Sequence, residues 1–193
     1  PRCIINAAAY TSVDLAEEEP DLAEALNFAV PAALSTLCAQ HGIRLIHVST
    51  DFVFDGAKGF PYKPSDITSP VNMYGVTKLK GERAVAESGA NHAILRTSWL
   101  YSQVGHNFVL TMLRLMQERN EIGVVSDQVG SPTFVNSLAQ VCWALAWDRD
   151  ARGIFHWSDL GEISWYEFAR AIAEEAFDLG LISNLVSVKP IMA

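Results

Sequence analysis

This sequence has few of the features that mark secreted, metal-binding or nucleic-acid-binding proteins. Its 193 residues include only 3 cysteines and 5 histidines, without the short spacings of disulfide frameworks or zinc sites, so we expect reduced thiols and no metal centre. The 14 lysines and arginines are outnumbered by 22 acidic residues. This acidic balance argues against a nucleic-acid partner, because phosphate backbones select basic surfaces.

Targeting segments and long apolar runs are also missing from the pattern. No basic stretch followed by an apolar one opens the chain, and we see no apolar run that approaches the length of a membrane span. We therefore predict a cytoplasmic protein without a membrane partner. Half of the residues are hydrophobic and 19% are charged, which indicates a globular chain, long enough for one domain or for one domain with an appendage.

The chain alternates apolar strand-like runs with helical patterns. Residues 3–9 and 43–49 are apolar without alternation, as is typical of strands buried on both faces of a parallel sheet. A helical pattern covers 21–40, where Pro31 predicts a kink or a two-piece helix and Gly42 a stop. Further helices are expected from Tyr74, after Asn107, after 127–133 and from Ser164, and further strands at 93–96, 122–125 and 153–157.

This alternation predicts an α/β fold, a Rossmann-like doubly wound parallel sheet with helices on both faces. The segment 50–70 is long and rich in Gly, Pro, Ser and Asp. It follows the predicted strand 43–49 at its carboxyl end, where open α/β sheets bind ligands. We therefore expect this segment to be functional.

Tyr74 and Lys78 are the first candidates for chemistry. Four residues apart near the start of a predicted helix, they lie on one helical face, one turn apart. A neighbouring ammonium lowers the pKa of a phenol, and such a tyrosine can donate and recover a proton at a carbonyl, the acid–base half of hydride transfer. The same spacing also occurs by chance in helices, with a half-buried Tyr beside a solvated Lys. The other motifs of the chain therefore decide between a catalytic pair and a chance pair.

Three further motifs fall at predicted strand ends: 7–11, 49–51 and 97–99. Because the carboxyl ends of parallel strands share one edge, we expect these motifs to converge with Tyr74 and Lys78 in one crevice. Each also has an interpretation without a ligand. Without a ligand, residues 7–9 would be small residues at a strand–helix contact, and Thr50 would cap a loop. Trp99 would belong to the core, and 127–133 would be a plain turn. Trp157 and Trp165 are assigned to the core.

Taken together, the motifs resemble the dTDP-4-dehydrorhamnose reductase family of the extended short-chain dehydrogenase/reductase superfamily. The resemblance runs in order through nearly the whole chain. Its stretches are Asn-Ala-Ala-Ala-Tyr-Thr at 6–11, Ser-Thr-Asp-Phe-Val-Phe-Asp-Gly at 49–56, Tyr-Gly-Val-Thr-Lys-Leu-Lys-Gly-Glu at 74–82, Arg-Thr-Ser-Trp-Leu-Tyr at 96–101 and Asp-Gln-Val-Gly-Ser-Pro-Thr at 127–133.

The resemblance implies reduction of dTDP-4-dehydro-β-L-rhamnose to dTDP-L-rhamnose with hydride from NADH or NADPH. It leaves open which cofactor is used, whether Mg²⁺ takes part and whether the protein is a homodimer. Tyr74 would protonate the C4 oxygen of the sugar, Lys78 would hold the nicotinamide ribose and lower the pKa of Tyr74, and Thr50 would assist. The substrate would contact Thr50, Asp51 and Trp99, and the cofactor would contact Ala8, Ala9, Tyr10, Thr11, Val48, Tyr74 and Lys78.

The chain departs from the family pattern in several places. Phe52 stands where Tyr is commoner, and Ser102 where Gly is usual. No Gly-x-x-Gly-x-x-Gly phosphate loop is present; in the family it lies upstream of the segment that matches Pro1, with the first βαβ part. We therefore expect a chain truncated at both ends that binds dinucleotide weakly, with a partial dinucleotide-binding Rossmann-like domain at 1–126 and a partial substrate-binding region at 127–193, interleaved with the last Rossmann elements.

Two other functions stay open. One is a non-catalytic binding subunit similar to the regulatory subunit of methionine adenosyltransferase, against which intact Thr50, Tyr74 and Lys78 count. The other is an epimerase or dehydratase of the same superfamily, which shares Tyr-x-x-x-Lys. Arg-Thr-Ser-Trp at 96–99 favours the reductase over these enzymes.

Overall fold

The computed structural model describes all 193 residues and divides into two compact units. Unit 1 comprises Pro1–Thr97 and Ala139–Trp157, and unit 2 comprises Ser98–Leu138 and Ser158–Ala193. The chain thus leaves unit 1 after β3 and returns to it once. The predicted boundary between 126 and 127 differs from this division, and the assignment of dinucleotide and substrate to separate parts stays a prediction.

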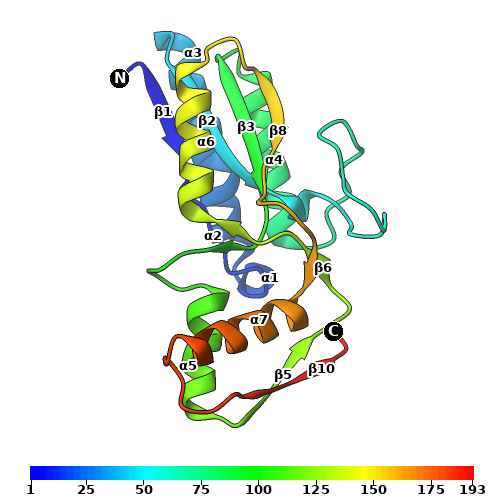
Figure 1. Ribbon diagram of the computed structural model, residues 1–193. Coiled ribbons are helices and arrows are strands. Elements are labelled where there is room, and N and C mark those ends of the chain that lie inside the picture. The colour runs from blue at the N-terminus through cyan, green and yellow to red at the C-terminus, as the bar shows by residue number, and fades with distance from the viewer. The chain divides into compact units, whose positions relative to one another are not determined.

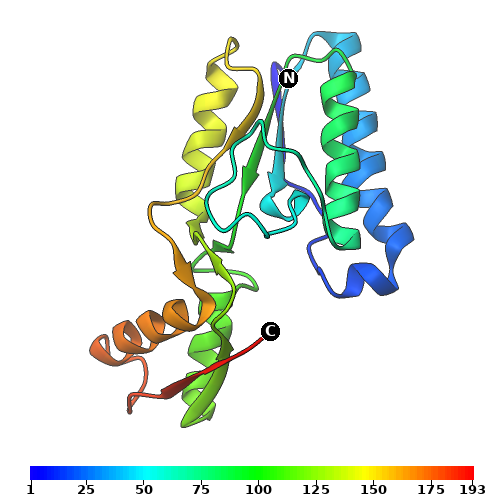
Figure 2. The same ribbon diagram turned by 90° about the vertical axis from the view of Figure 1, so that its right-hand side faces the viewer.

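Unit 1 is built on a four-stranded parallel sheet in the order β1-β2-β3-β8 (Figure 1). Its strands are β1 (Cys3–Asn6), β2 (Arg44–Thr50), β3 (His92–Thr97) and β8 (Gly153–His156). The central strands β2 and β3 are buried almost throughout, as their apolar runs predicted. Figure 2 shows α6 (Val135–Trp147) on one face of the sheet and the earlier helices on the other. The predicted parallel α/β fold is confirmed.

The first long helix runs without a gap from Pro20 to His41. It consists of α2 (Pro20–Glu24), a π-helical segment η1 (Ala25–Ala29) and α3 (Val30–His41), and it follows the short helix α1 (Leu15–Glu18). Proline has no N–H for the i−4 carbonyl. The interruption predicted at Pro31 therefore takes the form of a widened turn just before this residue. Gly42 ends the helix in the left-handed conformation at φ 62°.

This helix corrects one expectation. Its 22 residues have a mean hydropathy of 1.4, so by length and composition it could cross a membrane, and the statement that no apolar run approaches that length was wrong. In the structure its side chains pack within unit 1. Cys38 joins the buried cluster of Leu45 and Val85, and the buried Asn27 bonds to the Thr77 side chain. Only 28% of its apolar 18-residue window is buried inside the structure, so one face of this helix packs in unit 1 and the rest is exposed.

A long connection links β2 to α4 (Met73–Glu87). It begins with the 3₁₀ turn η2 (Asp51–Val53) and folds back on itself, since the Ser69 N–H donates to the Val53 carbonyl. Asn72 caps α4 by accepting the N–H of Gly75 at 2.8 Å. The catalytic candidates Tyr74 and Lys78 thus lie in the first two turns of a capped helix.

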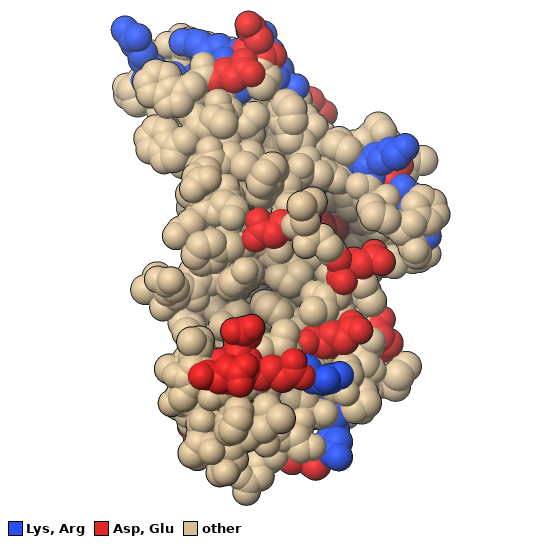
Figure 3. Space-filling model, viewed as in Figure 1, with Lys and Arg blue, Asp and Glu red and all other residues tan.

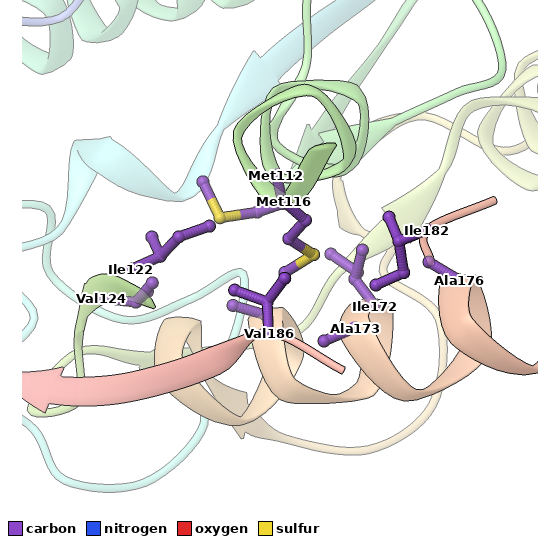
Figure 4. Close-up of a cluster of buried hydrophobic side chains, with 10 residues drawn as sticks. Met112, Met116, Ile122, Val124, Ile172, Ala173, Ala176, Ile182 and Val186 are labelled. Atoms are coloured by element: carbon purple, nitrogen blue, oxygen red, sulfur yellow. The ribbon is translucent and has the colours of Figure 1, made fainter. Parts of the chain in front are cut away.

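Unit 2 has its own hydrophobic core between two amphipathic helices and a two-stranded parallel sheet (Figure 4). The helices are α5 (Phe108–Glu118) and α7 (Trp165–Asp178), and β5 (Glu121–Val125) pairs with β10 (Ser187–Ile191). Two-residue strands form two further pairs, β4 (Leu100–Tyr101) with β7 (Thr133–Phe134) and β6 (Val129–Gly130) with β9 (Ile163–Ser164). Asn107 caps α5, and Ser164 with Glu167 forms a capping box on α7, so both predicted helix starts are confirmed.

Acidic side chains gather on unit 2, where Figure 3 shows a patch of red atoms. The exposed residues of α7 include Glu167, Glu174, Glu175 and Asp178. This surface has the sign that the acidic composition predicts.

All three cysteines are unpaired thiols. Cys38 and Cys142 are buried and Cys3 is partly exposed. Burial, which we expected of all three thiols, is thus found for Cys38 and Cys142 and only in part for Cys3.

Candidate active site

The predicted motifs of unit 1 follow neighbouring strands at one edge of the sheet. Asn6, the last residue of β1, is in register with His47 of β2, and Thr50 of β2 is in register with Thr97 of β3. The segments 7–11 and 49–51 therefore leave the sheet side by side. Trp99 belongs to unit 2.

Tyr74 and Lys78 are both buried on the face of α4 that turns inward, with 9% and 2% of their surface exposed. This burial rules out the alternative of a half-buried Tyr beside a solvated Lys. The Tyr74 ring packs edge to face on Phe52, with centroids 5.5 Å apart. The Lys78 ammonium donates to the Val48 carbonyl at 2.8 Å, which leaves two of its three N–H groups for other acceptors.

The pKa values correct the expected role of Lys78. Burial raises the pKa of the Tyr74 phenol, which the Thr50 side chain lowers and the Asp51 charge raises further. The predicted lowering by Lys78 was therefore wrong as a net effect, because desolvation disfavours the phenolate. Burial also lowers the pKa of Lys78 to about 8, against the opposing effect of Glu82. A protonated phenol at neutral pH suits a proton donor rather than a base.

Thr50 and Asp51 begin the long connection. The Thr50 hydroxyl accepts the Phe52 N–H and donates to an Asp51 carboxylate oxygen, both at 3.2 Å. The predicted loop cap at Thr50 is thus present, and it does not exclude a catalytic role because a hydroxyl has two acceptor lone pairs. Burial raises the pKa of Asp51 to about 6, although hydrogen bonds from Thr50 and the backbone oppose this.

The raised pKa of Asp51 predicts a stability change for Asp51→Asn. The folded protein binds the carboxyl proton of Asp51 more tightly than the unfolded chain does. The free energy of unfolding therefore falls as the pH rises from about 4 to 6, and above this range the buried carboxylate destabilises the fold to its full extent. At pH 8 the free energy of unfolding of Asp51→Asn, measured by urea denaturation, should exceed that of the unaltered protein by about 3 kcal/mol. The gain should vanish below pH 4.

Asp55→Asn is the matched control on the same loop. The Tyr62 hydroxyl and the Ala57 N–H lower the pKa of Asp55. This variant should therefore lose stability at pH 8. Equal shifts of the two variants in the same direction would contradict the assignment.

Asn27 is a site residue that the sequence analysis missed. It is fully buried, accepts the Tyr10 N–H at 2.9 Å, and donates to the Tyr10 carbonyl at 3.1 Å and to Thr77 at 3.2 Å. Asn27 thus clamps the loop after β1 to α4. A signal was present in the sequence, since an Asn inside an otherwise apolar helical pattern is costly to bury without partners.

The loop held by Asn27 has exposed small residues. Ala8 and Thr11 are exposed and Ala9 is partly exposed, so the alternative of a buried strand–helix contact does not apply to them. The Ala8 N–H donates to the Asn6 side chain at 3.2 Å, which fixes the backbone where it leaves the strand. The cofactor contacts of Ala8, Ala9 and Thr11 stay a prediction. The chain has no cluster of three or more His, Cys, Asp or Glu side chains that could hold a metal ion.

Two glycines allow α4 to lie against these segments. A Cβ on Gly75 would lie 2.2 Å from the Phe52 carbonyl oxygen, and one on Gly81 would lie 2.1 Å from that of Asn27. Side-chain atoms do not approach backbone so closely. These two positions therefore require glycine.

In unit 2, Trp99 joins the motifs at 96–101 and 127–133. It lies in the left-handed region at φ 47° and stacks on Trp165 with centroids 3.4 Å apart. The Thr133 N–H donates to the Trp99 carbonyl, and a Cβ on Gly130 would clash with the indole at 2.6 Å. The segment 127–133 is thus a packing partner rather than only a turn. Trp157, which we assigned to the core, is 38% exposed.

Comparison with known proteins agrees with this geometry. A dTDP-4-dehydrorhamnose reductase of Sinorhizobium fredii is 47% identical over 178 residues, 89% of this chain and 60% of that protein. The enzyme of the same name from Escherichia coli K12 is 43% identical over 186 residues, 94% of this chain and 62% of that protein. The crystal structure of the Bacillus anthracis enzyme in complex with NADP superimposes with a TM-score of 0.94 at 40% identity, covering 100% of this chain and 66% of that one.

A parallel α/β sheet with a buried Tyr-x-x-x-Lys pair beside its strand ends defines a Rossmann-like protein of the short-chain dehydrogenase/reductase type. The family described as RmlD substrate binding domain matches residues 1–192. The chain belongs to this family. It spans 60–62% of the length of the two curated relatives above.

Proposed function

We propose that the protein containing this chain reduces dTDP-4-dehydro-β-L-rhamnose to dTDP-L-rhamnose with NADPH or NADH. The observation that carries the proposal is the burial of Tyr74 and Lys78 on one face of α4, beside the polar ends of β1 and β2. The names of the relatives supply the substrate class and the direction of the reaction.

In this proposal Tyr74 gives its phenolic proton to the C4 oxygen as the carbonyl becomes an alcohol. Its raised pKa keeps that proton in place at neutral pH until charge develops on the substrate oxygen. Thr50 and Asp51 hold the sugar, and Thr50 also adjoins the phenol. Trp99 as a sugar contact remains a prediction.

A bound nicotinamide would supply the hydride. Lys78 would bind the ribose hydroxyls through the two donors that Val48 leaves unused. Ala8, Ala9, Tyr10 and Thr11 would line the cofactor, with Tyr10 fixed in place by Asn27. The backbone of Val48 completes the set, since its carbonyl orients the ammonium.

The test is turnover by the full-length protein. It is mixed with dTDP-4-dehydro-β-L-rhamnose and NADPH, or NADH, while loss of the reduced nicotinamide absorbance is followed and the product is identified by chromatography and NMR. We expect stoichiometric formation of dTDP-L-rhamnose. A different nucleotide sugar formed without net oxidation of the cofactor would identify an epimerase or dehydratase instead.

A binding subunit would give a third result. It would show no turnover and would co-purify with a synthetase in stable stoichiometry, as the resemblance to the regulatory subunit of methionine adenosyltransferase implies. The buried Tyr74 and Lys78 support the reductase, because a binding role gives no reason to bury an ammonium. Cytoplasmic location remains a prediction from the sequence pattern, and a homodimer remains a prediction from the resemblance.

A further inference from the structure

A buried ion pair lies one turn beyond Lys78 on α4. Glu82 and Arg96 are 2% and 4% exposed. The Arg96 guanidinium forms a fork with the carboxylate, with its Nη2 2.7 Å from Oε2 and its Nε 2.9 Å from Oε1. The Ser49 hydroxyl donates to Oε1 at 2.5 Å. Both carboxylate oxygens are therefore occupied by partners from β2 and β3.

The position of Glu82 makes this arrangement unexpected. Glu82 is four residues from Lys78, the spacing at which helical side chains of opposite charge pair. Both side chains are buried, where such attraction is strongest. Nevertheless Lys78 forms no ion pair with Glu82, and its ammonium donates to the Val48 carbonyl instead. Something must hold Glu82 away from Lys78, and the fork with Arg96 does so.

We propose that Arg96 is a positioning residue for the active site, which acts by occupying Glu82 so that the Lys78 ammonium stays on Val48 with two donors available. The inference rests on the proposed function, because it assigns those donors to the cofactor. Without Arg96, Glu82 would be a buried and unpaired carboxylate, and Lys78 is the cation within its reach.

The charged and titratable groups around Lys78 are few. On α4 itself they are Tyr74 and Glu82. From β2, His47 faces it and is neutral, because burial and the Lys78 charge lower its pKa to about 3. The charge of Asp51 in η2 raises the pKa of Tyr74, and the charge of Arg96 in β3 is balanced by that of Glu82 in their ion pair. Burial lowers the pKa of Lys78 and the charge of Glu82 raises it, so a change at Glu82 or Arg96 should be measurable at Lys78.

The experiment measures the titration of Lys78 directly. The full-length protein without cofactor is labelled with acetic anhydride across a range of pH, and labelling of each lysine is quantified by peptide mass spectrometry. The midpoint for Lys78 in the unaltered protein should lie near 8. In Arg96→Met it should rise by at least about one unit, which lowers labelling at pH 8 about fivefold or more. In Glu82→Gln it should fall below the midpoint of the unaltered protein.

Lys80 is the internal control, since it lies on the same helix but pairs with Glu24 at the surface. Its midpoint should be the same in every variant. An unchanged or lowered Lys78 midpoint in Arg96→Met would overturn the proposal. If Arg96→Met does not fold, Arg96→Lys replaces it, because a lysine keeps the charge but cannot form the fork, and an unchanged midpoint there would overturn the proposal equally.

Kinetics separate positioning from a purely structural role. Arg96→Met should lower kcat about tenfold or more and raise the KM for the cofactor, and the double variant Glu82→Gln with Arg96→Met should recover most of the loss. Equal losses in the single and double variants would mean that Arg96 only supports the fold. The labelling result does not depend on turnover, so an inactive protein would refute the proposed function and leave the Lys78 measurement valid.

Discussion

Replacing Tyr74 by phenylalanine is expected to lower kcat by about 10²–10⁴-fold, the usual contribution of a positioned general acid. Tyr74 lies on the buried face of α4, and its raised pKa keeps the phenol protonated at neutral pH. Phenylalanine has no proton to give as the carbonyl oxygen gains charge. The reaction would then depend on water, which has poor access to a side chain that is 9% exposed.

The variant should leave folding and cofactor binding nearly unchanged. Phenylalanine keeps the ring that packs edge to face on Phe52. The measurement is steady-state turnover together with cofactor affinity and the urea midpoint. Tyr166→Phe is the control, since Tyr166 lies on α7 in unit 2 and lacks any assigned role. Full activity of Tyr74→Phe would remove Tyr74 from the mechanism.

Gly81→Ala should have the largest effect on stability. The added methyl group would lie 2.1 Å from the carbonyl oxygen of Asn27 and 3.3 Å from its carbonyl carbon. Backbone atoms cannot rotate aside, so α4 and η1 must separate. Overpacking costs about 1–3 kcal/mol where side chains can yield, and more where they cannot. We therefore expect a loss of about 3 kcal/mol or more in urea denaturation.

The same substitution should weaken cofactor binding. Asn27 holds both backbone groups of Tyr10, so a displaced η1 would move the loop after β1. Gly123→Ala is the control, because its new methyl group would meet only the flexible side chain of Ile191 at 3.2 Å. If both variants unfold at the same urea concentration, the close approach at Gly81 is not a constraint.

Local signals predicted the elements of this fold well. Gly42, Asn107 and Ser164 each end or begin a helix where the sequence placed that boundary. These signals work because a cap bonds to backbone within a few residues, so its partner is fixed by chain connectivity. The apolar runs of β2 and β3 likewise required burial on both faces.

Local signals could not predict contacts between residues that are distant in the sequence. The clamp from Asn27 to Tyr10 and Thr77, the ion pair of Glu82 with Arg96, and the stacking of Trp99 on Trp165 join positions whose separation in the chain gives no reason for contact. The helix Pro20–His41 shows the same limit. Composition alone allows it to cross a membrane, whereas the structure shows which of its residues, Cys38 among them, pack in unit 1.

By itself the sequence determined the parallel α/β architecture, the family and the candidate pair Tyr74 and Lys78, because these depend on local periodicity and on residue identity at short spacings. How that pair titrates depends on its burial in the folded chain. Spacing on a helix suggests that an ammonium should acidify the neighbouring phenol, but burial raises the pKa of Tyr74 and lowers that of Lys78. Desolvation depends on every segment that packs over a group, and the segments that pack on α4, among them β2, η2 and the helix Pro20–His41, meet it only when the chain folds.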